Sequence, residues 1–241
     1  MEARVTVDAQ TLMVIFGGGG DDKSLGDLWE LELVQNETQS VLIWPDCKWR
    51  ERNQSGDVPP GRFGGAMTSQ SVNGQSLLLL YGGCPMDRLG KDLCGAASPL
   101  QDLSVAQYSL TGPIVWKHLV QSGATLPFAT WPTMETIAGS RLVVYGGYGL
   151  NATIGSRAER LVHYGNQTYL GTWNATHVDW MEVGQGPSTF GSSVLVSLNN
   201  STLAVVGAPL KESVKVSQHA CFLAWTHITW LAAALCLGPR F

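Results

Sequence analysis

The chain has 241 residues and a formal net charge of −4, with 44% hydrophobic and 14% charged residues. This composition excludes a disordered or collagen-like chain, and the acidic balance argues against a nucleic-acid partner bound through its phosphates. Glycine (28 residues) and tryptophan (9 residues) are abundant, which is typical of many short strands joined by tight turns.

An apolar run that ends in a glycine pair recurs along the chain. It reads LMVIFGGGG at 12–20, LLLLYGGCP at 77–85 and RLVVYGGYG at 141–149, and a weaker copy, STLAVVGAP, occupies 201–209. The first three glycine pairs are about 65 residues apart. A run that is apolar at every position predicts a strand that is covered on both faces.

Each of the first three units continues with an alternating segment and then a tryptophan. The alternating segments are DLWELEL (27–33), SVAQYSL (104–110) and RLVHYGN (160–166), and their period of two predicts strands. The tryptophans are Trp49, Trp116 and Trp180, and the first two are each followed by a glycine and a proline at identical spacing.

Four short strands per unit, repeated in this order, predict an all-β protein with the architecture of a β-propeller. The strands amount to about three and a half four-stranded blades, an incomplete ring, at 1–63, 64–130, 131–190 and, in part, 191–210. Residues 211–241 are expected to form an apolar C-terminal tail. Because an open ring exposes strand edges and an apolar face, we expect this sequence to be a fragment of a larger protein.

The units resemble the kelch repeat, whose blades carry an apolar run ending in Gly-Gly, then a tyrosine and then a tryptophan. The resemblance spans residues 3–210, with Leu31, Tyr108 and Tyr164 at the equivalent aromatic position. It implies a kelch-type β-propeller, for which extracellular receptors of the attractin type are the nearest architectural analogue. The period here is longer than the usual value of about 50 residues, and the second unit carries a long insertion, Cys84 to Leu103.

One candidate binding residue follows from this resemblance. Arg62, in the segment PPGRFGG, matches the arginine that many kelch blades hold before their inner strand. The corresponding positions of the next two units are Ala129 and Thr189, so a full ring of binding-face arginines is not expected.

The asparagines point to the secretory pathway. Seven of the eight begin an Asn-x-Ser/Thr sequon, where chance would give about one: Asn36, Asn53, Asn151, Asn166, Asn174, Asn199 and Asn200. They predict a glycoprotein in the extracellular space or the secretory-pathway lumen. The N-terminal residues lack the pattern of a signal peptide, so we expect that Met1 is not the biological start.

Five cysteines leave one without a partner within the chain. Cys84 and Cys94 bracket nine residues of the insertion, and we expect a disulfide between them, with two buried free thiols as the alternative. The sequence assigns no partner to Cys47, Cys221 or Cys236.

The tail contains nineteen consecutive positions without a formal charge, 220–238. Their length permits a membrane anchor, although His227 lies near the middle. A mis-predicted end of the gene is the alternative.

The motifs of common enzymes are absent from the sequence, so we expect a non-catalytic protein without a cofactor or a metal site. The run Gly17 to Gly20 precedes an alternating strand rather than a helix, which argues against a phosphate cradle. His163 and His177 lack a third ligand for a copper site. Two alternatives remain open: a copper-oxidase-like or carbohydrate-active propeller fragment, and a cytosolic (cytoplasmic) kelch adaptor.

Function is therefore expected on the loops. The loops that follow the glycine pairs, at 21–26, 85–99 and 148–156, are expected to emerge at one face. The middle loop is the longest and carries four charged residues: Asp87, Arg88, Lys91 and Asp92. We expect these residues, together with Arg62, to bind a protein ligand or a glycoprotein partner.

Overall fold

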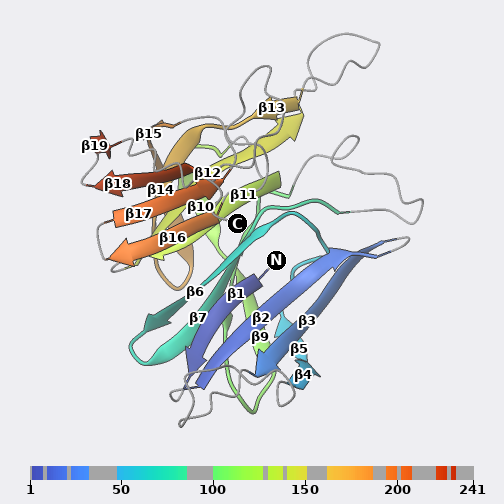
Figure 1. Ribbon diagram of the computed structural model, residues 1–241. Helices are drawn as coiled ribbons and strands as arrows, with labels where there is room; N and C mark the ends of the chain where they lie inside the picture. Colours follow the sequence, from blue (N-terminus) through green and yellow to red (C-terminus); the bar gives the residue numbers. More distant parts are fainter. Residues whose placement is uncertain are drawn as a thin grey trace, which may run out of the picture.

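The computed structural model describes residues 2–7, 10–20, 23–32, 48–85, 100–126, 130–137, 140–150, 162–186, 194–199, 202–207, 221–226 and 229–231. Within these ranges the regular elements are all strands, and the strands form four sheets (Figure 1).

Each sheet has a core of four antiparallel strands in chain order. The first sheet contains β1 (Glu2–Val7), β2 (Gln10–Gly19), β3 (Ser24–Glu32) and β4 (Lys48–Glu51). The second contains β6 (Ala66–Val72), β7 (Gln75–Tyr81), β8 (Leu103–Gln107) and β9 (Ile114–His118). The third contains β11 (Thr130–Ile137), β12 (Arg141–Leu150), β14 (Gln167–Trp173) and β15 (His177–Gln185). The fourth contains β16 (Val194–Asn199), β17 (Thr202–Gly207), β18 (Cys221–Thr226) and β19 (Thr229–Leu231).

The sheets meet through their first strands. Strand β6 contacts both β1 and β11, and β11 in turn contacts β16. The first strands of successive sheets therefore lie next to one another, while the later strands of each sheet lie farther from this meeting line (Figure 1). A radial arrangement of this kind is the one expected for propeller blades.

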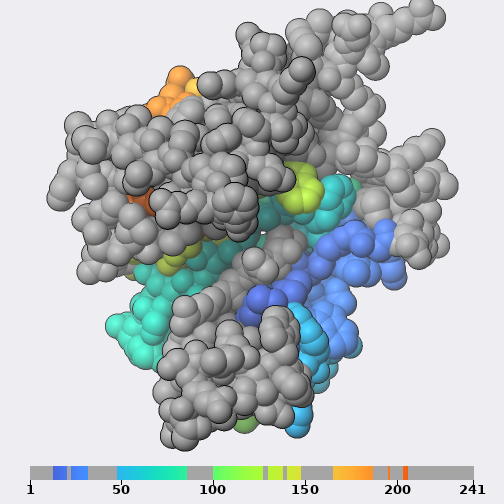
Figure 2. Space-filling view, in the orientation of Figure 1, coloured from blue at the N-terminus to red at the C-terminus, as the bar shows by residue number. Residues whose placement is uncertain are grey.

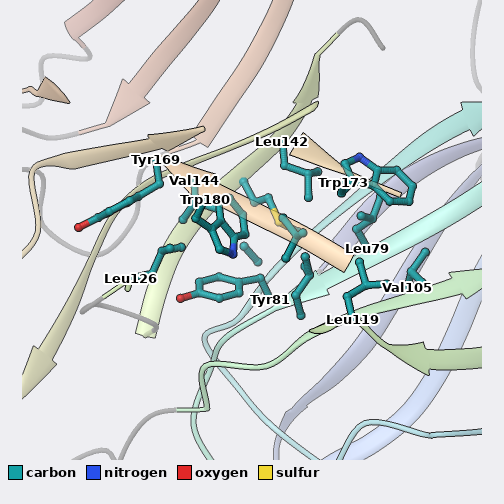
Figure 3. Packing of buried hydrophobic residues seen from close by; sticks show 14 residues of the cluster. Leu79, Tyr81, Val105, Leu119, Leu126, Leu142, Val144, Tyr169, Trp173 and Trp180 are labelled. Atoms are coloured by element: carbon teal, nitrogen blue, oxygen red, sulfur yellow. The ribbon is translucent and has the colours of Figure 1, made fainter. Parts of the chain in front are cut away.

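Buried side chains fill the space between consecutive sheets, and the apolar runs supply both sides of it. On β7, Leu78 and Leu80 belong to the cluster shared with the first sheet, whereas Leu79 belongs to the cluster shared with the third. Successive side chains of a strand point to opposite faces, which explains why the run is apolar at every position. Figure 3 shows the second cluster, where Leu79 and Tyr81 lie against Leu142 and Trp180.

Two short strands cross from one sequence unit to the next sheet. Strand β5 (Gln54–Gly56) follows the first sheet in the chain but pairs in parallel with β9 of the second sheet. Strand β10 (Val120–Gly123) follows the second sheet and pairs in parallel with β15 of the third. We call β5 and β10 the crossing strands.

The crossing strands make the same contact with a tryptophan. The indole Nε1 of Trp116 donates to Gln54 Oε1 at 2.8 Å, and that of Trp180 donates to Gln121 Oε1 at 2.9 Å. Each glutamine then donates from Nε2 to a carbonyl of the preceding unit, Gly26 O at 2.9 Å or Gln101 O at 2.6 Å. We call this arrangement the Trp–Gln joint.

An aromatic residue of the preceding sheet completes each joint. The ring centroid of Phe16, which precedes the first glycine pair, lies 5.6 Å from that of Trp116. Tyr81 precedes the second glycine pair, and its centroid lies 6.2 Å from that of Trp180. Both tryptophans are almost completely buried. The sequence motifs that define the repeat are therefore the groups that connect one sheet to the next.

A buried ionic cluster provides a further link between the first two sheets. Arg52 and Arg50 form ion pairs with Glu30, and the Tyr108 hydroxyl donates to the same carboxylate. Arg52 also donates to Gly112 O at 2.8 Å. Burial opposes ionisation of Glu30, but these hydrogen bonds outweigh it and hold the pKa of this carboxyl below its usual value.

The third sheet differs from the sequence-based prediction. The strand next to β15 is Gln167–Trp173, not the alternating segment 160–166. That segment contributes β13 (Val162–Tyr164), which pairs with the extended end of β12. Register places Gly171 opposite Trp180 as Ala106 lies opposite Trp116, so Tyr164 does not occupy the position of Tyr108. A long hairpin extension also has a period of two, which is why the pattern misled the assignment.

Strands β18 and β19 lie within residues 211–241, where the sequence analysis expects a tail. Strand β18 pairs with β17 over its whole length, and β19 pairs with β18. Among the described residues, none belongs to a helix long and apolar enough to cross a bilayer.

Replacement of Gly123 by alanine should destabilise the protein. Gly123 has φ +81°, and a Cβ there would overlap the backbone of Trp180 across the joint. We expect a loss of about 2–4 kcal/mol in the free energy of unfolding, measured by urea denaturation. Gly112→Ala is the control, because a Cβ there meets only Ser109. Equal effects of the two substitutions would contradict the role of the joint.

Glu30→Gln should alter the acid limb of the stability profile. A depressed pKa in the folded state means that the ionised carboxylate stabilises the fold near neutral pH, and that this contribution is lost as the pH falls through the folded-state value. We expect the variant to lose about 2–3 kcal/mol at neutral pH and to show a smaller further loss between about pH 7 and pH 3. Urea titrations at several pH values test this, with the exposed Glu182→Gln as control. Parallel profiles for wild type and E30Q would contradict it.

Candidate interaction surface

The glycine-pair strands end on one side of the molecule. Strands β2, β7 and β12 all run toward the right-hand side of Figure 1. In each of these three units the first glycine of the pair has a closely similar positive φ, 65° at Gly17, 68° at Gly82 and 68° at Gly146. Glycine adopts this conformation at no steric cost. The first glycine therefore gives the backbone the same local conformation in three units, and β2 and β12 continue beyond it to Gly19 and Leu150.

The insertion between β7 and β8 has a well-defined base on this face. Leu100 N donates to Gly83 O at 2.8 Å and Gly82 N donates to Asp102 O at 3.2 Å, so the two ends of the insertion are joined. Phe63 and Cys84 exchange two backbone hydrogen bonds of 2.9 and 2.8 Å. The insertion therefore starts and finishes on a backbone scaffold that also includes the segment before β6.

Arg62 holds this base together from inside. Its guanidinium makes a bidentate contact with the Asp102 carboxylate, with both N–O distances 2.7 Å, and also donates to Gly82 O at 2.9 Å. The side chain is 0% exposed. The backbone of Arg62 connects to the first sheet as well, because its N–H donates to Leu25 O at 3.0 Å. We call the contact between Arg62, Asp102 and Gly82 the arginine clamp.

This geometry changes the interpretation of Arg62. The sequence analysis expects it to touch a partner, but every described contact of its guanidinium is internal and the side chain is shielded from solvent. In this structure it is a positioning residue that fixes the two ends of the insertion.

Cys84 links the base to the neighbouring loops. It is disulfide-bonded and fully buried, while Cys94, its expected partner, lies outside the described residues. Thr130 Oγ1, at the start of β11, lies 3.3 Å from Cys84 Sγ, and Ser24 Oγ, at the start of β3, lies 3.5 Å from Cys84 O. Groups from the first and third sheets thus converge on the base of the insertion.

The remaining predicted contact residues lie outside the described ranges, namely Asp87, Arg88, Lys91 and Asp92. The same holds for three of the sequon asparagines, Asn36, Asn151 and Asn200, and the side chain of Asn199 is also not described. Asn53 and Asn174 are exposed and Asn166 is half-buried. Asn174 Oδ1 accepts hydrogen bonds from the N–H groups of Thr176 and His177 at 3.0 and 2.9 Å, which forms a compact turn.

A cavity of about 150 Å³ lies between the second and third sheets, beside the Trp–Gln joint of Trp180. Tyr81, Gln101, Gln121 and Leu126 contribute to its lining. Within the part of the chain that the structure describes, the Tyr81 hydroxyl has no hydrogen-bond partner, and burial raises its pKa. Ligand pockets usually enclose about 300–1,000 Å³, so this cavity is too small to be the main binding site.

Sequence reasoning missed the partners that define the site and the joints. Asp102 is 40 residues from Arg62, and no local pattern connects an isolated aspartate to a distant arginine. The glutamines of the joints could have been found from the sequence, because QSG occurs at both 54–56 and 121–123, at the same distance after a tryptophan. Within the described residues, histidine, cysteine and carboxylate side chains form no group of three suited to a metal ion.

Asp102→Ala should destabilise the protein by about 2–4 kcal/mol, because it leaves the buried Arg62 charge without its counterion. The double variant Arg62→Met, Asp102→Ala removes that charge and should recover part of the loss. Urea unfolding measures both, with the exposed Asp57→Ala as control. If the two substitutions acted independently, the double variant would be less stable than D102A by the whole cost of losing Arg62. That result would contradict the clamp.

Comparisons with known proteins identify the fold rather than a family. No family model matches the sequence, and no curated protein matches it. The structure is similar to a chain in the cryo-EM structure of RAG in complex with one melted RSS and one unmelted RSS, with a TM-score of 0.63 and 14% sequence identity. The match covers 98% of this chain and 65% of the other chain. This protein is therefore an all-β protein with a fold similar to that RAG chain, which is consistent with a propeller-like architecture.

Proposed function

We propose that this chain is part of a kelch-type propeller that acts as a non-catalytic interaction module. The observation that carries the proposal is the arginine clamp, in which a fully buried arginine joins the two ends of one insertion. A preorganised loop base lowers the entropy cost of binding. The insertion carries two acidic and two basic residues, Asp87, Arg88, Lys91 and Asp92, which suit a polar protein or glycoprotein partner.

The proposed location is the extracellular space or the secretory-pathway lumen. Seven sequons support it, and so does the disulfide at Cys84, because disulfides persist mainly in oxidising compartments. Asn53 and Asn174 are exposed and so are accessible to glycosylation.

The test compares two charge-neutralised variants of the full chain, both produced by secretion and presented as labelled protein to an array of extracellular domains. In the first, Asp87, Arg88, Lys91 and Asp92 become alanine. In the second, four exposed charges elsewhere become alanine: Asp57, Lys117, Arg141 and Glu182. Both variants remove two acids and two bases, so net charge is matched.

We expect the wild type to bind a specific partner, the first variant to bind it at least about tenfold more weakly, and the second to bind it normally. Enzymatic removal of N-glycans from one sample separates recognition of protein from recognition of glycan. Equal binding by the two variants would contradict the insertion as the contact surface.

A further inference from the structure

The outer edges of the second and third sheets are each covered by a crossing strand. Strand β5 lies parallel to β9 with Gly56 opposite Trp116, and β10 lies parallel to β15 with Gly123 opposite Trp180. In both cases the backbone N–H after the glycine donates to the tryptophan carbonyl, from Asp57 at 3.0 Å and from Ala124 at 2.8 Å. The two crossing strands therefore occupy the same kind of receptor, by which we mean the outer edge of a sheet's last antiparallel strand together with its tryptophan.

Strand β4 presents the corresponding receptor on the first sheet. Trp49 on β4 lies opposite Leu31 on β3, as Trp116 lies opposite Ala106 on β8. The order of strands places β4 at the end of the first sheet, and among the described residues no strand pairs with its outer edge. The receptor is thus built from the same strand and the same tryptophan as the two that are filled.

Trp49 is also much more exposed than its two counterparts, which pack against the preceding sheet as well as the crossing strand. Its side chain is 48% exposed, whereas Trp116 and Trp180 are 0% and 3% exposed. The other residues of β4, Lys48, Arg50 and Glu51, are exposed as well. Figure 2 shows the coloured residues of β2, β3 and β4 and the segment that follows them, in blue and light blue, at the surface of the molecule. A large indole at an open strand edge is a feature that proteins usually cover.

We propose that the outer edge of β4, together with Trp49, is a docking surface for a parallel strand that carries the sequence Gln-x-Gly and is supplied by another repeat of the same kind. The glutamine Oε1 accepts the hydrogen bond of the Trp49 indole, and the glycine adopts a positive φ against the Trp49 carbonyl. The two filled receptors define this chemistry, because Gln54 with Gly56 and Gln121 with Gly123 make these contacts. The interaction adds a strand to an open sheet edge, which is an established mode of peptide recognition.

A peptide tests the proposal on the full chain. The probe is a fluorescent peptide with the sequence of residues 119–126, LVQSGATL, titrated against the protein and followed by anisotropy. Two matched peptides replace the glutamine or the glycine by alanine. The first loses the acceptor for the indole, and the second places a Cβ against the tryptophan carbonyl.

Two variants of the protein locate the binding. Trp49→Phe keeps an aromatic ring but removes the indole N–H, and Trp131→Phe is the control because Trp131 is also exposed and lies on β11 of another sheet. Thermal melting verifies that both variants are folded. Amide hydrogen exchange of residues 48–51, with and without the peptide, reports directly on the β4 edge.

We expect saturable binding of the parent peptide, at least about tenfold weaker binding of the glycine variant, and binding by W49F that is about fivefold weaker than by wild type or W131F. The amides of β4 should gain protection. The proposal is overturned if the parent peptide does not bind at concentrations up to about 2 mM. It is also overturned if W49F binds as well as W131F, since the peptide would then be replacing a crossing strand at β9 or β15.

Discussion

The first three sheets are connected by a hydrogen bond between a buried tryptophan and a glutamine of the preceding unit. A buried indole N–H without an acceptor is costly, and Gln54 and Gln121 supply the acceptor at Trp116 and Trp180. The amide nitrogen of each glutamine is used on the preceding unit. One side chain thereby satisfies two polar groups and connects two sheets, at tryptophans that also belong to the apolar clusters between the sheets.

The ionic cluster and the arginine clamp likewise satisfy buried polar groups, here charged ones. Glu30, Arg52 and Arg62 are all buried, and a buried charge is tolerated only when a counterion and further hydrogen bonds compensate for lost water. Glu30 forms an ion pair with Arg52 and accepts a hydrogen bond from the Tyr108 hydroxyl. Arg62 forms an ion pair with Asp102 and donates a hydrogen bond to Gly82 O. Each group joins chain segments that are far apart in sequence. Such networks favour one arrangement of the sheets, because any displacement would leave a charge unpaired.

The repeat motifs of the sequence predicted the strands that carry them. The apolar runs before the glycine pairs lie in β2, β7, β12 and β17, since a run without polar residues can be accommodated only where both faces are covered. The segment RLVHYGN failed as a predictor because alternation does not distinguish a hairpin extension from a central strand. Arg62 was predicted as a contact residue because it matches an arginine of the kelch pattern. Its ion pair is with Asp102, a residue 40 positions away, so the sequence pattern gave no sign that the side chain is buried.

The segment between β5 and β6 connects the packing of two sheets to the base of the insertion. After β5 forms the joint with Trp116, the chain continues to Arg62, whose backbone contacts Gly18 and Leu25 of the first sheet. Its side chain then reaches Gly82 and Asp102 of the second sheet. The same short segment thus fixes the packing of two sheets and the base of the insertion. The corresponding position of the next unit is Ala129, which has no guanidinium, so the clamp cannot be repeated there. The clamp is therefore specific to the second unit, where it joins the two ends of the insertion.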